Sequence, residues 1–147
     1  MKTGAISFLE MRTEAVLGSI RVLNDLLEVA LRALGVPGDQ RHDLALGLAE
    51  LVANVCQHEY AAVGDSSPGV TVALDARDGD LLLTVTSFGP PFDLKAQIQI
   101  ATARDPLEEL AGSGLGLPLL VALFDELEST YEQGTGNVIT LRKRRAS

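Results

Sequence analysis

The segment 112–120 combines alternating glycines with a helix-like apolar run. Glycine occupies every second position from Gly112 to Gly116, and mostly leucine follows. Because glycine has no Cβ, such a turn can adopt positive φ angles and bring its backbone N–H groups close to a ligand. The helix that follows would point the positive end of its dipole at the same place, which favours phosphate. A glycine-rich turn before a helix is also an ordinary connector, so the run alone leaves both interpretations open.

A second segment, residues 43–58, carries apolar residues at helical spacing and predicts a largely buried helix. On it Glu50, Asn54 and His58 recur every four residues. Each step of four rotates only about 40° around the helix axis, so the three side chains share one stripe. An asparagine inside a helix is unfavourable unless its amide has a partner. Glu50 and Asn54 could therefore supply a general base and an oxygen ligand for Mg²⁺, and the alternative is a solvated helix face.

The order of the remaining elements predicts an α+β fold. Asp78-Gly79 between two apolar runs is a strong hairpin signal, and Asp39 is a candidate cap for the buried helix. We expect a two-layer sandwich in which a mixed or antiparallel sheet is covered on one face by about three helices, within a single domain spanning residues 1–147. The predicted strands are 5–11, 70–76, 81–86, 128–132 and 137–142; the predicted helices are 16–34, 43–58, 118–127 and a short one within 95–111.

Composition excludes several functions. The net charge of −8 argues against nonspecific nucleic-acid binding, because phosphates would be repelled. The basic run 142–145 is interpreted as a solvated end. No apolar stretch is long enough to span a bilayer and no signal peptide is evident, which predicts a cytoplasmic protein without a membrane partner. The only cysteine, Cys56, is interpreted as a small buried hydrophobic residue.

Three motifs together resemble those of the Bergerat-fold (GHKL) ATPases. Glu50-x-x-x-Asn54 resembles the N-box, and Gly112-x-Gly114-x-Gly116 resembles the second glycine box. The segments 50–60, 89–93 and 114–126 are most similar to the anti-sigma factor serine kinases within that family. The resemblance runs in the right order over nearly the whole chain.

The resemblance implies roles for individual residues. Glu50 would polarise the attacking group and Asn54 would bind Mg²⁺, while the phosphates of ATP would lie against the second glycine box, which comprises Gly112, Ser113, Gly114, Leu115 and Gly116. The segment 87–93, with Gly89, would occupy the place of the first glycine box. There an aspartate normally accepts a hydrogen bond from the adenine amino group, and Ser87 stands in its place. A hydroxyl is the weaker acceptor, at a cost of roughly 1–3 kcal/mol. Thr140 has two interpretations, as a residue near adenine or as an ordinary strand threonine.

For function, the resemblance implies a serine/threonine protein kinase that uses ATP and Mg²⁺. It would phosphorylate an anti-anti-sigma protein of the STAS type and sequester a sigma factor, and proteins of this branch commonly act as homodimers. The alternative is a partner-binding module that kept the fold and lost most of the chemistry. The Ser87 replacement favours the module, whereas the retained Glu50, Asn54 and glycine run favour the kinase.

Overall fold

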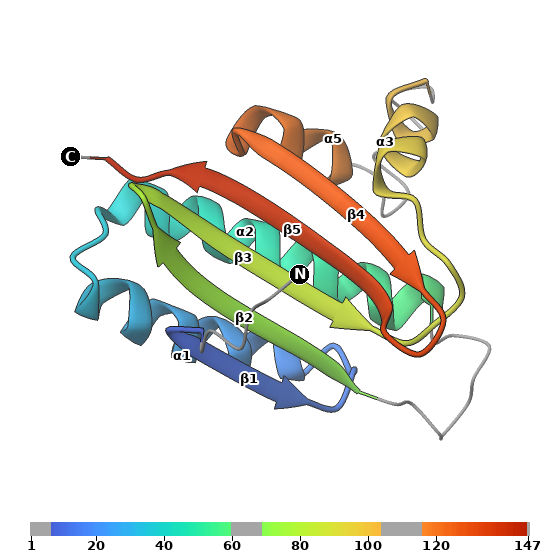
Figure 1. The fold of residues 1–147 in the computed structure, drawn as a ribbon, viewed down its shortest axis with the longest axis horizontal. Helices are drawn as coiled ribbons and strands as arrows, with labels where there is room; N and C mark the ends of the chain where they lie inside the picture. The colour runs from blue at the N-terminus through green and yellow to red at the C-terminus, as the bar shows by residue number, and fades with distance from the viewer. Residues whose placement is uncertain (1–6, 60–68, 104–115, 147) are drawn as a thin grey trace.

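A computed structural model describes residues 7–59, 69–103 and 116–146. In these residues five strands form one antiparallel sheet in the order β1-β2-β3-β5-β4 (Figure 1). The central strand β3 pairs with β2 on one side and β5 on the other, so β1 and β4 are the edges of the sheet. The strands are β1 (Leu9–Thr13), β2 (Val70–Arg77), β3 (Asp80–Ser87), β4 (Glu126–Glu132) and β5 (Gly136–Arg144).

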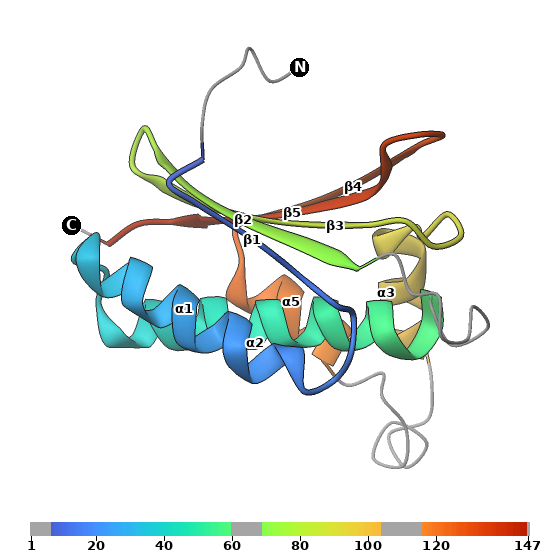
Figure 2. The same ribbon diagram turned by 90° about the horizontal axis from the view of Figure 1, so that it is seen from below.

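Helices cover one face of this sheet (Figure 2). Three of them, α1 (Ser19–Ala33), α2 (Gly38–Asn54) and α5 (Gly116–Leu123), lie below the sheet, and α3 (Leu94–Ala103) lies at one end. A π-helical turn, η1 (Val55–Glu59), continues α2. The fold prediction is confirmed, and the sheet is purely antiparallel in the described part of the chain. None of the helices found there is long and apolar enough to cross a membrane.

Strand alternation decides which side chains meet the helices. In β3, Leu81, Leu83, Val85 and Ser87 are buried, whereas the residues between them are only partly buried. Leucines of α1 and α2, such as Leu27 and Leu48, fill the other side of the core and are almost completely inaccessible. Burial of this apolar surface is the main force that holds the two layers together.

Several predicted boundaries were wrong. The first strand begins at Leu9 and extends to Thr13, beyond the predicted end at residue 11, and residues 1–6 lie outside the described ranges. The helix predicted over 118–127 ends at Leu123, because Asp125 donates its backbone N–H to Arg142 of β5 and strand β4 begins immediately afterwards. Asp39 lies in the first turn of α2, and Pro37 occupies the N-cap position.

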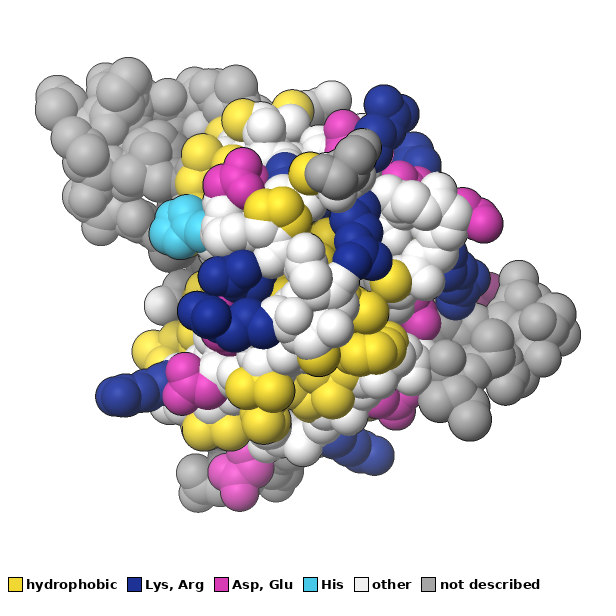
Figure 3. Space-filling model, turned by 90° about the vertical axis from the view of Figure 1, so that its left-hand side faces the viewer, with side chains coloured by type: hydrophobic (Ala, Val, Ile, Leu, Met, Phe, Trp, Pro, Cys, Tyr) yellow, Lys and Arg dark blue, Asp and Glu magenta, His cyan; other side chains and the backbone are white. Residues whose placement is uncertain are grey.

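The basic run near the C-terminus is not a solvated end, because its side chains hold the fold together. Arg142 bonds to Asp80 and Glu126, and Arg145 donates to the carbonyl of Leu34 beyond the end of α1. Lys143 donates to the carbonyl of Leu123 at 2.5 Å. At this end of the molecule Lys and Arg side chains lie among Asp and Glu side chains, without an unbroken basic patch (Figure 3).

Candidate functional site

Glu50 and Asn54 form a hydrogen-bonded pair on one face of α2. Asn54 is 6% exposed, and its Nδ2 atom donates to the Glu50 carbonyl at 2.8 Å and to Glu50 Oε2 at 2.7 Å. The four-residue spacing places the two side chains one helical turn apart. These bonds turn the amide nitrogen toward Glu50 and the amide oxygen away from it. The structure therefore explains why an asparagine is acceptable inside this helix.

Gly116 brings the start of α5 against the same carboxylate. A Cβ atom added at Gly116 would lie 1.5 Å from Glu50 Oε1 and 2.2 Å from Cδ. Only a glycine allows the α5 backbone to come this close to Glu50. Two motifs more than sixty residues apart in sequence, the N-box and the end of the glycine run, thus meet at one point. The helix start was predicted at Pro118, two residues late.

An open cleft of about 310 Å³ lies beside Glu50, between α2 and α5. Among the residues that the structure describes, Glu50 is the single ionisable one in its lining, and the others are Leu46, Ala49, Gly116, Leu119, Leu120 and Leu123. Burial raises the pKa of Glu50 above the ordinary value of 4.5, and the hydrogen bond from Asn54 acts in the opposite direction. A carboxylate with a raised pKa is better matched to accepting a proton near neutral pH.

Ser87 ends β3 on the side of the sheet that faces the helices, and it is only 2% exposed. The end of β3 and the end of α2 lie at the same end of the molecule (Figures 1 and 2). Ser87 and Asn54 thus both lie between the sheet and the helices, at the same end of the molecule. Gly89 follows in the loop that leads to α3, and its carbonyl accepts a hydrogen bond from Asn137 at 3.3 Å.

Asn137 is a residue that the sequence reasoning missed. It is 1% exposed, pairs with Ser87 across the β3–β5 ladder, and bonds to the loop after Ser87. The signal was present in the sequence, because an asparagine alternates there with Ile139 and Leu141 on the apolar side of a predicted strand.

Thr140 is placed away from the other candidates. It pairs with Thr84 and with Glu128, on the sheet face opposite the helices. Strand alternation turns the Thr140 side chain away from the layer that holds Glu50 and Asn54, and its nearness to adenine stays a prediction. The other interpretation, an ordinary strand threonine, agrees with this placement.

The remaining candidates lie outside the description. Gly112, Ser113, Gly114 and Leu115 are outside the described residues, so their part in a phosphate site stays a prediction. His58 lies in the π-helical turn that follows Asn54. Within the described ranges there is no cluster of three or more His, Cys, Asp or Glu side chains that could hold a metal ion.

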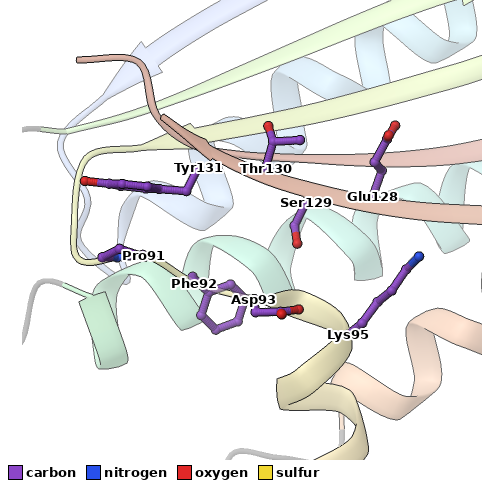
Figure 4. A pocket seen from close by; sticks show the side chains of 8 residues that line it. All are labelled: Pro91, Phe92, Asp93, Lys95, Glu128, Ser129, Thr130 and Tyr131. Atoms are coloured by element: carbon purple, nitrogen blue, oxygen red, sulfur yellow. The ribbon is translucent and has the colours of Figure 1, made fainter. Parts of the chain in front are cut away.

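A larger cavity of about 540 Å³ lies elsewhere, along the edge strand β4 (Figure 4). Its walls come from β4 and from the loop and first turn of α3, and they include neither Glu50 nor Asn54. They comprise Pro91, Phe92, Asp93, Lys95, Glu128, Ser129, Thr130 and Tyr131. The larger of these two cavities is therefore not the one beside the Glu50–Asn54 pair.

Known sequences and one family model match most of this chain. The family model of the histidine kinase-like ATPase domain matches residues 13–143. The serine-protein kinase RsbW of Bacillus cereus (strain ATCC 10987 / NRS 248) is 24% identical over 136 residues, covering 90% of this chain and 82% of that protein. RsbW of Bacillus licheniformis is 26% identical over 134 residues, covering 88% and 82%.

Two solved structures share the fold. The SiaB–SiaC complex from Pseudomonas aeruginosa matches with a TM-score of 0.65 and 22% identity, over 92% of this chain and 88% of that one. The RsbU and RsbW domains of Rv1364c from Mycobacterium tuberculosis match with a TM-score of 0.66 and 23% identity, over 95% of this chain and 32% of that one. At these identities the likeness concerns the fold alone, and it agrees with the predicted α+β sandwich.

Proposed function

The chain belongs to the family of histidine kinase-like ATPase domains, and from this premise we propose that it is an ATP-dependent serine/threonine protein kinase. Its substrate would be an anti-anti-sigma protein of the STAS type. When the unphosphorylated form of that protein is scarce, the kinase would instead bind and sequester a sigma factor. The membership confirms the family resemblance of the motifs, and the similarity to serine-protein kinases supports the anti-sigma branch. The observation that carries the proposal is the Glu50–Asn54 pair held directly against Gly116.

Glu50 would act on the attacking hydroxyl. The carboxylate would accept the hydrogen bond, and finally the proton, of the substrate serine while the serine oxygen forms its bond to the γ-phosphorus and the bond to the β-phosphate oxygen breaks. Phosphoryl transfer needs little covalent chemistry from a protein, so orientation and charge stabilisation carry most of the catalysis. The raised pKa of Glu50 and its apolar cleft suit this task.

The residues present fit a magnesium nucleotide. Mg²⁺ prefers one or two protein oxygen ligands and takes its other ligands from phosphates and water, and the Asn54 amide oxygen is such a ligand, turned away from Glu50. When bound, the ion neutralises charge on the phosphates. The start of α5, where Gly116 leaves room for close approach, would hold the phosphates through its backbone N–H groups.

A second candidate is a nucleotide-free partner-binding module of the same fold. One observation favours it: the place of the adenine-reading aspartate is taken by Ser87, a nearly inaccessible hydroxyl. Calorimetric titration with ATP, with and without Mg²⁺, separates the two candidates. The kinase requires Mg²⁺-dependent binding that Asn54→Ala weakens, and phosphoryl transfer that Glu50→Gln abolishes while ATP binding persists. Absence of binding in the unaltered protein would support the module.

A further inference from the structure

The loop between β3 and α3 is held by the side chain of Asn137. The Asn137 Oδ1 atom accepts the backbone N–H of Phe92 at 2.8 Å, and Nδ2 donates to the carbonyls of Pro90 at 2.8 Å and Gly89 at 3.3 Å. Both ends of one amide are thus used on the backbone of a single loop. The side chain is 1% exposed, so water does not compete for these bonds.

The composition of the loop explains why it depends on a side chain. The ladder between β3 and β5 ends at the pair of Ser87 and Asn137, and Pro90 and Pro91 in the loop that follows have no backbone N–H. The Asn137 amide donates to the loop carbonyls and accepts from the loop N–H of Phe92. A second contact lies further along, where the backbone N–H of Leu94 donates to Ser129 Oγ of β4 at 3.1 Å.

The start of β5 is also pressed against Ser87. Gly136 has a φ of +86°, and a Cβ added there would lie 2.2 Å from the Ser87 carbonyl oxygen. Ser87, Gly136 and Asn137 therefore form one closely packed group from which the loop departs. Phe92, at the far end of the loop, packs against the hydrophobic core and lines the cavity in Figure 4.

We propose that Asn137 is the positioning residue for the base-binding end of the nucleotide site, acting through the loop it holds and touching no base itself. This inference rests on the proposed function. Ser87 is a weak reader of adenine, so affinity for the base depends on a loop whose backbone is fixed in advance. Pre-organisation of this kind contributes to affinity by removing the entropy cost of ordering the loop on binding.

The test compares ATP with inorganic tripolyphosphate, both with Mg²⁺, by calorimetry. Tripolyphosphate carries the phosphates without the base, so it reports on the Asn54 and Gly116 end alone. Asn137→Ala should weaken ATP binding about tenfold, the size expected for losing one or two net hydrogen bonds, and leave tripolyphosphate binding within about twofold. Asn137→Ser keeps a smaller group that can donate and accept and adds no buried charge. It should fall between, which also covers the case in which the alanine variant does not fold.

Gln40 provides a matched control. It is 9% exposed, and its amide bonds to two backbone groups, the Arg144 carbonyl at 2.7 Å and the Ala146 N–H at 3.0 Å, near the start of α2. Gln40→Ala should lower the melting temperature without changing the ratio of the two affinities. Equal weakening of both ligands by Asn137→Ala, or an unchanged ATP affinity, would overturn the inference.

The failure of the inference can be told from that of the proposed function. If the unaltered protein binds ATP no better than tripolyphosphate, no base affinity exists for Asn137 to support, and the inference alone fails. If the unaltered protein binds neither ligand, the proposed kinase function fails and the inference fails with it.

Discussion

Replacing Gly116 by alanine tests the central contact of the site. The new Cβ would lie 1.5 Å from Glu50 Oε1, whereas ordinary van der Waals contact begins at 3.4 Å. The carboxylate must therefore retreat by about 2 Å, judged from these two distances. Such a movement would break its 2.7 Å bond with Asn54. Because a displacement of about 1 Å can reduce catalysis about a hundredfold, we expect Gly116→Ala to lose at least that factor in phosphoryl transfer.

Stability should change much less than activity. The atoms that the new methyl group meets belong to the end of a flexible side chain, which can move at little cost. We expect the free energy of unfolding to change by no more than about 1 kcal/mol. The assays are single-turnover transfer from labelled ATP to the STAS-type substrate, or to water, and urea denaturation.

Two further variants make the prediction specific. Gly47→Ala would place its Cβ 2.7 Å from Phe124 and 2.9 Å from Leu141, so it should destabilise the core without acting on Glu50 directly. In a Glu50→Ala background the Gly116→Ala methyl group meets no carboxylate, so the clash is absent. The stability changes of the two single variants should therefore not add up to that of the double variant. Unchanged transfer by Gly116→Ala would refute the reasoning, because Glu50 and α5 would then not be in contact in the working protein.

The remaining predictions concern charge. Since burial raises the folded pKa of Glu50, the folded state binds that proton more tightly than the unfolded state, and stability must fall as pH rises through the folded pKa. Glu50→Gln should flatten this pH dependence and be the more stable protein near neutral pH. Urea denaturation from pH 4 to 8 measures this, and an unaltered slope of stability against pH would contradict it. Ser87→Asp should tighten ATP binding about tenfold through a charge-assisted hydrogen bond and leave GTP binding unchanged in calorimetry; equal gains for both nucleotides would remove Ser87 from the base end. Lys143 is paired with Asp43 at 3.0 Å and bonded to Leu123; Lys143→Met should cost about 1–3 kcal/mol of stability in urea denaturation, and a smaller loss would mean that solvent replaces both partners.

The parts of the site that lie on one helix were predictable from the sequence. The four-residue spacing of Glu50 and Asn54 fixes their relation through helix geometry alone, and the structure has them hydrogen-bonded. The contact with Gly116 was not predictable from spacing, because it depends on how α5 packs against α2. The family resemblance implied only that both residues belong to one nucleotide site.

The face on which Thr140 lies could have been predicted from the sequence. Residues 137, 139 and 141 alternate with 138, 140 and 142, so the apolar Ile139 and Leu141 already place Asn137 on the inner side and Thr140 on the outer side. The hydrogen bonds of Asn137 were beyond sequence reasoning, since they depend on where a loop with two prolines turns back.

The misjudged end of the helix predicted over 118–127 has a physical cause. Periodicity continues from α5 into residues 124–127, but β4 pairs there with β5 and tertiary hydrogen bonds prevail over local preference. The same competition explains the basic run, where the sequence indicates solvation and the fold provides acceptors for Arg142, Lys143 and Arg145.

The Glu50–Asn54 pair has a mechanical consequence. Both side chains belong to one helix and are bonded to each other, so their spacing is set within α2. The approach of α5, which is set where Gly116 meets Glu50, belongs to a separate element. A displacement of α5 relative to α2 would therefore assemble or separate the whole site. Gly116, which has no side chain, lies at the point where the two helices meet.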